Sequence, residues 1–149
     1  MKTSTTSVGL KTNQLARLVL TNAYVTFAST DLSDHIASVS LNTTYDIVET
    51  TAFGDTAKKR VAGLADNSVS FEFHQDYASG SVESTIYPLL GTAIACEVRP
   101  VNTTVSATNP KYTFSVLISE WTPLNGAVGE LATASVTWPI SGAITKSTS

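Results

Sequence analysis

The chain has 149 residues, of which 42% are hydrophobic and 14% charged, and its formal net charge is −3. This length and hydrophobic content suit one globular domain with a real core and exclude wholesale disorder. The acidic balance excludes a protein that grips duplex DNA by phosphate neutralisation, but not one past which DNA slides without adhesion. This low charge content is consistent with a protein whose surface is largely buried in contacts with partners in an assembly. A secreted β-sandwich shares this composition.

The N-terminal region predicts an arm followed by a first strand. Residues 1–12 are rich in Ser and Thr, and the apolar spacing over residues 14–20 is helical but too short to define a helix. We therefore expect a flexible N-terminal arm over about residues 1–20. Residues 22–29 alternate as a strand does, and residues 31–34 carry the Asp and Ser side chains typical of a turn.

The central part of the chain predicts two strands joined by an unusually long connection. Residues 36–41 and 68–74 both alternate as half-buried strands do. The inter-strand loop between them, about residues 42–67, far exceeds the usual hairpin loop of about two to five residues. A connection this long inside a compact β domain is usually functional. We interpret it as an arm meant for a neighbouring subunit.

Residues 81–90 form the one convincing helix, with Val82, Ile86, Leu89 and Leu90 on one stripe. Pro88 removes a backbone hydrogen bond from the helix interior, so we expect the helix to be short, kinked or 3₁₀-like near its end. Gly91 is a natural stop.

Three further strands follow the helix, over residues 92–99, 112–121 and 132–138. Pro139 is expected to end the last of them, leaving residues 140–149 as a frayed tail or docking strand.

These elements predict a single domain over residues 1–149 of the mainly β class. With about six or seven strands and one helix, the simplest architecture is an antiparallel β-sandwich or partly closed barrel with one flanking α-helix. Such a sheet leaves exposed edges that must be covered or paired. Pairing them between subunits would produce a ring.

The residues that carry chemistry give little support for an enzyme. His74 lies two residues from both Glu72 and Asp76, so an active site built on His74, Asp76 and a serine is one hypothesis. No nucleophile elbow or glycine-rich oxyanion loop accompanies it, and a polar strand face is the preferred interpretation. We expect no catalytic residue.

Cofactor and metal sites are also not expected. The chain has neither a Walker pattern nor a dinucleotide fingerprint. His35 and His74 are the only histidines, and neither has Cys or His partners at zinc-ligand spacing. Asp31 and Asp34 lack the glycine and terminal Glu of a calcium loop.

Cys96 is the one cysteine, and its apolar surroundings predict a buried, unreactive thiol. No disulfide framework points to an oxidising compartment. No stretch reaches the ~18 apolar residues of a membrane span, and no leader-like region follows the N-terminus, so we expect an aqueous location and no membrane anchor.

Two features suggest contacts with other molecules. Lys58, Lys59 and Arg60 form the only basic cluster, which is either a solvated loop or a docking contact with an acidic neighbour. Most aromatic residues alternate along strands and belong to the core. Trp121 is the aromatic side chain that we would place at an interface.

Six runs stand out in one order over about residues 22–146. They are DHIASVSL at residues 34–41, VETTAFGD at 48–55, AGLADNSVS at 62–70, YPLLG at 87–91, SATNP at 106–110 and TASVTWP at 133–139. Together these runs resemble the tail tube proteins (major tail proteins) of long-tailed, non-contractile bacteriophages.

The resemblance implies a structural virion protein that self-assembles into stacked hexameric rings. The rings would form the hollow tail tube through which the genome is ejected into the host. Implied partners are other copies of the chain, the tape measure, the tail terminator and the baseplate or tip. DNA would transit the lumen without specific binding, the protein would reside in the virion tail, and assembly would occur in the host cytoplasm.

The resemblance also suggests roles for individual residues. The inter-subunit arm would use Thr50, Phe53, Asp55, Lys58, Lys59, Arg60 and Leu64. A polar, acidic lumen wall that repels phosphates would use Glu72, His74, Glu97 and Arg99. The alternative function is a monomeric β-sandwich binding module, for example one that binds sugars on a virion or cell surface through an exposed aromatic such as Trp121.

Overall fold

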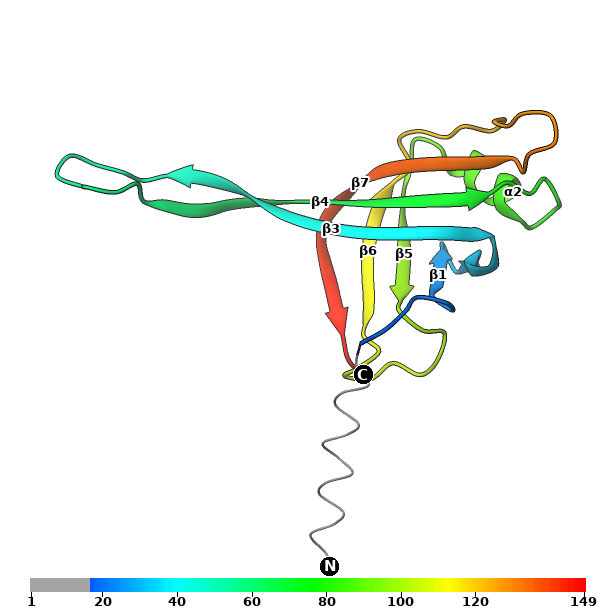
Figure 1. The fold of residues 1–149 in the computed structure, drawn as a ribbon, viewed down its shortest axis with the longest axis horizontal. Coiled ribbons are helices and arrows are strands. Elements are labelled where there is room, and N and C mark those ends of the chain that lie inside the picture. The colour runs from blue at the N-terminus through cyan, green and yellow to red at the C-terminus, as the bar shows by residue number, and fades with distance from the viewer. Residues whose placement is uncertain (1–16) are drawn as a thin grey trace, which may run out of the picture.

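The computed structural model describes residues 17–149 and contains seven antiparallel strands and one short α-helix (Figure 1). The strands pair in the order β2-β1-β5-β6-β7-β4-β3. Because β2 and β3 lie at the two ends of this series, the sheet is not a closed barrel. The predicted fold class is confirmed. The strands are β1 (Tyr24–Phe27), β2 (Thr30–Asp31), β3 (Ile36–Glu49), β4 (Arg60–His74), β5 (Ala93–Arg99), β6 (Lys111–Leu117) and β7 (Thr133–Ser147).

The sheet folds into two layers because β7 belongs to both. Its first half pairs with β4 as far as Pro139, and its second half pairs with β6 from Ile140 onward. Layer A therefore contains β2, β1, β5, β6 and the second half of β7, and layer B contains the first half of β7, β4 and β3. In Figure 1, β7 bends between the two layers, whose strands run across one another. Gly142 follows the bend with a φ of 93°, a conformation that favours glycine.

The expectation that Pro139 ends the last strand and that residues 140–149 form a tail is wrong. β7 continues to Ser147. Proline has no backbone N–H to donate, but Pro139 lies where β7 exchanges one partner strand for another. The ladder is interrupted at that point, so the missing donor does not end the strand.

The core fills the space between the layers. Phe27 of layer A meets Phe71 and Trp138 of layer B, with ring centroids 5.1 and 6.1 Å apart. These are edge-to-face contacts, which add to the stabilisation from burial of apolar area. The predicted strand alternation holds here, because the inward-facing residues of β1, β4, β5, β6 and the first half of β7 are buried.

The helix is as short as Pro88 predicts. α2 covers only Val82–Ile86 and passes directly into a 3₁₀ turn, η3 (Tyr87–Leu89). Val82 and Ile86 are buried against the core, so this short helix covers one end of the sandwich. The turn expected over residues 31–34 is also present, as η2 (Ser33–His35), and the Ser33 N–H donates to Asp31 Oδ1 at 2.9 Å.

The long inter-strand loop expected over residues 42–67 is mostly strand. β3 and β4 continue far beyond the body, and only residues 50–59 lie between them. We call residues 44–66 the arm, which projects from the sandwich as a two-stranded ribbon (Figure 1). β3 pairs with β4 along the arm, with a bulge between Tyr45 and Ile47.

The N-terminal arm expected over residues 1–20 falls largely outside the described residues. Residues 17–20 form neither helix nor strand. Within the described part of the chain, no helix is long and apolar enough to cross a membrane.

Candidate assembly surfaces

The arm is fixed to the body at its root by a buried asparagine. Asn67 is only 4% exposed. Its amide nitrogen donates to the carbonyl of Gly142 at 2.9 Å, and its amide oxygen accepts from the Thr43 hydroxyl. Asn67 therefore joins β3, β4 and the bend of β7, which ties the base of the ribbon to the corner of the sandwich.

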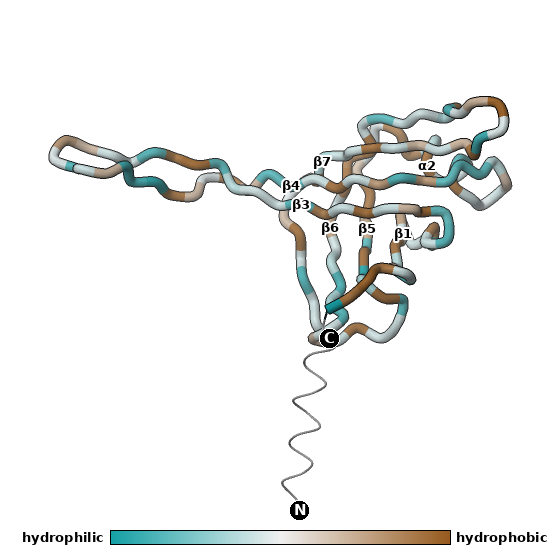
Figure 2. Tube along the Cα trace, viewed as in Figure 1, coloured by the Kyte–Doolittle hydropathy of each residue, from teal (hydrophilic) through white to brown (hydrophobic). Residues whose placement is uncertain are grey.

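Beyond this root, both faces of the arm meet solvent. Its large hydrophobic side chains are exposed on the isolated chain: Tyr45, Ile47, Val48, Phe53, Val61 and Leu64. Figure 2 shows these hydrophobic segments interspersed with hydrophilic ones along the ribbon. A two-stranded ribbon in water is marginally stable by itself, and contiguous exposed apolar residues mark interaction surfaces.

The tip of the arm is an ordered turn. Asp55 accepts a hydrogen bond from the Ala52 N–H at 2.8 Å and forms an ion pair with Lys59 at 2.7 Å. The bond from Lys59, followed by that from Ala52, lowers the pKa of Asp55. The Lys59 N–H donates to the Thr51 hydroxyl at 2.9 Å. Phe53 is held at the end of this turn with its side chain 109% exposed.

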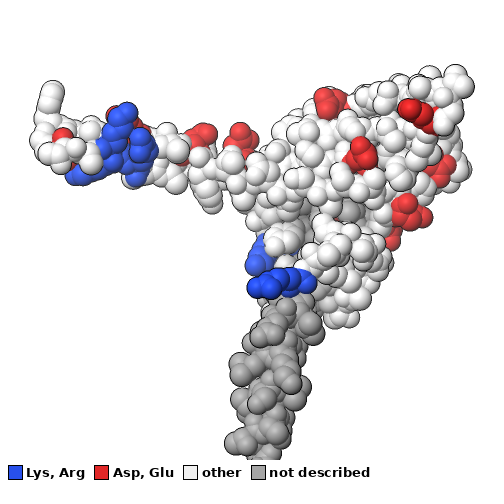
Figure 3. Space-filling view, in the orientation of Figure 1, with Lys and Arg blue, Asp and Glu red and all other residues white. Residues whose placement is uncertain are grey.

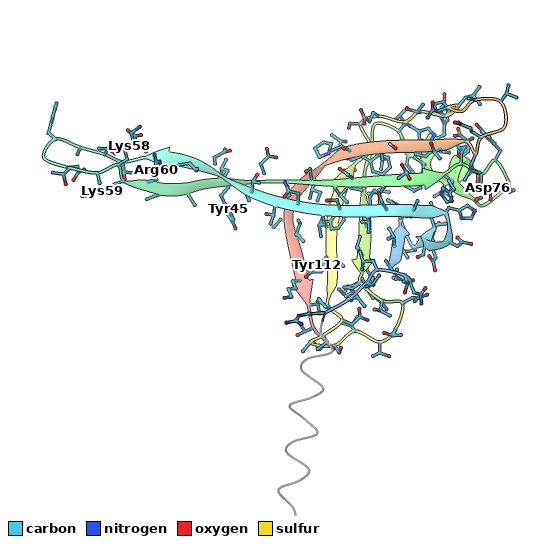
Figure 4. The ribbon with its side chains drawn as sticks, in the orientation of Figure 1. Tyr45, Lys58, Lys59, Arg60, Asp76 and Tyr112 are labelled. Carbon is cyan, nitrogen blue, oxygen red and sulfur yellow. The ribbon has the colours of Figure 1, made fainter. Side chains whose placement is uncertain are left out.

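The basic cluster lies beside this turn. Figures 3 and 4 place Lys58, Lys59 and Arg60 together near the outer end of the arm. Lys58 reaches Glu49 at 3.8 Å, an exposed pair of little energetic value. Arg60 forms no ion pair within residues 17–149. The tip therefore presents an aromatic ring together with excess positive charge.

The four residues predicted to line a lumen do not share one surface. Glu72 and His74 alternate with the buried residues of β4 and lie on the outer face of layer B. Glu97 and Arg99 lie on the outer face of layer A, where they form a 2.5 Å ion pair. Arg99 also lies 4.5 Å from the ring centroid of Tyr24. The first pair thus places one carboxylate on the outer face of layer B, and the charges of the second pair cancel.

The outer face of layer B is rich in small hydroxyl side chains. Ser38 pairs with Glu72 across β3 and β4, and Glu72 pairs with Ser135 across β4 and β7. The neighbouring Ser70 and Thr137 hydroxyls are hydrogen bonded at 2.9 Å.

The body end opposite the arm is acidic. It is built from the β4–α2 loop (residues 75–81), α2 and the β6–β7 loop (residues 118–132), and we call it the acidic end. Gln75 connects the three parts, since its amide donates to Glu83 at 3.0 Å and to the Pro123 carbonyl at 2.9 Å. The chain contains no Lys or Arg over residues 61–98 or 112–145.

The placement of Trp121 at an exposed interface is wrong. Its indole N–H donates to Glu83 at 2.8 Å, and its ring packs on the core beside Phe73 with centroids 5.3 Å apart. The strand expected over residues 112–121 is too long, because β6 ends at Leu117. Trp121 therefore lies in the β6–β7 loop, where strand alternation gives no guide to burial. The exposed aromatic side chains of the described residues are Tyr45, Phe53, Tyr77 and Tyr87.

The hypothetical active site on His74 and Asp76 is also not formed. Asp76 pairs instead with His35, whose Nε2 lies 2.8 Å from Asp76 and whose Nδ1 lies 2.7 Å from Asp34. Burial lowers the pKa of His35, but the hydrogen bonds and charges of Asp76 and Asp34 outweigh it and raise this pKa. Ser81 Oγ is 3.3 Å from Nε2. Both ring nitrogens of His35 thus face carboxylates, and Asp76 lies closer to Nε2 than Ser81 does.

The remaining candidates for chemistry are the thiol of Cys96 and possible metal ligands. Cys96 is buried, as predicted, and burial followed by the charge of Glu97 raises the pKa of its thiol. Among the described residues, no group of three or more His, Cys, Asp or Glu side chains is arranged to hold a metal ion.

A groove of about 560 Å³ lies beneath the root of the arm, between the two layers. Val39, Leu41 and Tyr45 of β3 line one side, and Tyr112 and Ile144 line the other. Lys146 gives its rim a positive charge, since Arg99, which also lines the groove, is paired with Glu97.

Comparison with known proteins finds similar folds in solved structures of a gene transfer agent particle and of an extracellular contractile injection system. No protein-family model and no curated protein matches the chain. Solved structures do match it, at low sequence identity. A chain of the virion of a native gene transfer agent (GTA) particle matches with a TM-score of 0.69 and 10% identity, over 88% of this chain and 99% of that one.

Two further structures agree. A chain of the PVC sheath-tube complex, from an extracellular contractile injection system in the extended state, matches with a TM-score of 0.68 and 11% identity, over 93% of this chain and 98% of that one. A chain in the tail of an empty GTA particle, determined with C6 symmetry, matches with a TM-score of 0.54 and 12% identity, over 74% and 81% of the two chains. At these identities the comparisons establish the fold.

Proposed function

We propose that this chain is a tail tube protein, a structural subunit that assembles into stacked hexameric rings around a hollow channel. The observation that carries this proposal is the arm, which is a free-standing ribbon with an ordered tip and exposed apolar side chains. In an isolated monomer these side chains remain in water and contribute no hydrophobic stabilisation. Contact with another copy would remove them from water.

The open edge of layer B supports the same function. β3 has 14 residues and β4 is its only partner strand in the described part of the chain. A long unpaired edge is a template for pairing with another chain. Joining such edges around an axis would produce a closed ring, and the C6 tail structure that shares this fold supports six copies.

We further propose that the outer face of layer B lines the channel. Glu72 and His74 lie on this face among serine and threonine side chains. A weakly acidic wall of small polar groups would repel phosphates and let DNA pass without binding. Glu97 and Arg99 are less suited to this role, because they neutralise one another on the other layer.

The setting would be a virion tail assembled in the host cytoplasm. Partners would include the tape measure, terminator and baseplate or tip proteins, in keeping with the tail and sheath-tube assemblies that contain similar folds. The sequence resemblance supports a non-contractile tail. A contractile injection system also contains this fold, so a sheath protein that copurifies with the native tube would contradict that part of the proposal.

The test is sedimentation velocity of the purified full-length chain over a concentration series, followed by electron microscopy of the fastest species. We expect large particles above a threshold concentration, with hollow cylinders of uniform diameter and six-fold end views. A chain that remains monomeric throughout the series would contradict the proposal and favour a binding module. Hollow cylinders with another ring symmetry would contradict only the hexamer.

A further inference from the structure

Charge is separated along the long axis of the molecule. Lys58, Lys59 and Arg60 lie near the tip of the arm, whereas Asp76 lies at the far end of the body (Figure 4). Figure 3 shows acidic side chains over the body end that faces away from the arm, and the basic side chains of the body near the C-terminus instead. The two ends of the long axis therefore carry opposite charge.

Apart from Asp76, which pairs with His35, the carboxylates of the acidic end have no cationic partner among the described residues. Glu83 accepts hydrogen bonds only from the neutral Gln75 and Trp121 side chains, and Glu120 accepts one from the Thr137 N–H. Glu130 is exposed on the β6–β7 loop. Within residues 17–149 none of these three carboxylates has a Lys, Arg or His partner. A basic group from outside the chain would therefore meet unpaired charge here.

The acidic end also exposes apolar side chains against which an aromatic ring could pack. Its exposed large hydrophobic residues include Leu124, Leu131 and Val128, which is 104% exposed. The tip has the complementary set, namely Phe53 beside the basic cluster. An exposed aromatic anchor flanked by charge is typical of interaction hot spots.

We propose that the tip of the arm, residues 50–60, docks on the acidic end of a second copy of this chain. Phe53 packs against the exposed apolar residues of the β6–β7 loop, and Lys58 and Arg60 approach Glu120 and Glu130. This inference rests on the proposed function, and it names the surface that receives the arm. The groove beneath the arm root fits less well, because its lining includes Lys146 and no carboxylate that could attract a basic tip.

The geometry allows this contact to repeat head-to-tail. The tip and the acidic end are different surfaces at opposite ends of the molecule, so a copy that docks its tip on one neighbour can receive the tip of another. Each copy offers one arm and one receiving end. A heterologous contact of this kind propagates from copy to copy, which is what the growth of a tube requires.

Nucleic acid is a poorer partner for the tip. The arm carries Asp46, Glu49, Asp55 and Asp66 against its three basic residues, so its net charge is −1. Neutralisation of phosphates requires a concentrated basic surface, which this arm lacks.

The test exchanges the charges of the two surfaces. The tip variant is Lys58→Glu with Arg60→Glu, which leaves the Lys59–Asp55 ion pair of the turn intact. The end variant is Glu120→Lys with Glu130→Lys, which leaves Glu83 and its hydrogen bonds to Gln75 and Trp121 in place. The matched control is Lys146→Glu, a reversal at an exposed lysine of the body. Circular dichroism first establishes that all three variants are folded.

We expect each double variant alone to require at least about a tenfold higher concentration than wild type to assemble, because like charges would then meet. An equimolar mixture of the two should assemble near the wild-type concentration, since each tip then finds an end of opposite charge. The control should behave as wild type. If the mixture is no better than its components while wild type assembles, this inference is wrong and the tube proposal stands. A wild-type chain that does not assemble contradicts both.

Discussion

The proposed role of the arm predicts that Phe53 stabilises the assembly and contributes little to the stability of the monomer. Phe53 is fully exposed at the tip, so Phe53→Ala removes no intramolecular packing. We expect the free energy of unfolding of the monomer to change by less than about 0.5 kcal/mol, as for surface substitutions generally. Burial of a phenylalanine side chain in a contact contributes about 2 kcal/mol, which corresponds to roughly a 30-fold change in an equilibrium constant.

The assay is the concentration at which the protein begins to sediment as large particles. For Phe53→Ala this concentration should rise roughly 30-fold over wild type, while the thermal melt of the monomer stays unchanged. Phe53→Tyr keeps the ring, whose hydroxyl can face solvent, and should assemble nearly as wild type. An unchanged assembly threshold for Phe53→Ala would refute the reasoning, because the side chain would then remain in water in the assembled state.

Three further outcomes are expected. Replacing residues 44–66 by an Asn-Gly turn should preserve the circular dichroism spectrum of the body and abolish sedimentable particles, and particles that persist would contradict the role of the arm. Asn67→Ala should destabilise the fold by about 1–3 kcal/mol in denaturant unfolding, because it leaves buried hydrogen-bonding groups unpaired, whereas the exposed Asn42→Ala should be nearly neutral. The raised pKa of His35 means that its stabilising contribution is complete below about pH 6.5 and is lost as pH rises through the folded value, so His35→Gln should flatten the decline in Tm as pH rises above about 6.5. An equally steep decline in that variant would assign the effect to another group.

The sequence predicts the body well because one face of each strand meets the core. Val69, Phe71 and Phe73 are buried while Ser70 and Glu72 are not, and this contrast is what an alternating pattern records. The shortened helix was predictable for a similarly local reason, since Pro88 lacks the N–H that a longer helix would need.

The strands of the arm could not be predicted in the same way, because neither face of the arm packs against the core. Both faces of residues 43–49 and 60–66 meet solvent in the monomer, so polar and apolar residues need not alternate. The sequence therefore indicates a long functional connection but not that it is two paired strands. The second half of β7 is hidden for a related reason, because Pro139 interrupts the pattern where the strand changes layers.

The candidate surfaces were predictable in composition but not in placement. The basic cluster and Phe53 could be singled out from their residue types. The structure places the cluster near the outer end of the arm and leaves Phe53 fully exposed in the turn between β3 and β4. The acidic end could not be anticipated, because it gathers residues from two separate loops and a helix. Its one sequence signal is the absence of Lys and Arg over residues 61–98 and 112–145.

A cryo-electron-microscopy reconstruction of the particles formed by the purified full-length chain tests the central claim most directly. We predict a hollow tube of stacked rings in which the arm of each subunit lies against the acidic end of another copy. Compact closed oligomers without a channel, or tubes whose arms extend free into solvent, would contradict the account.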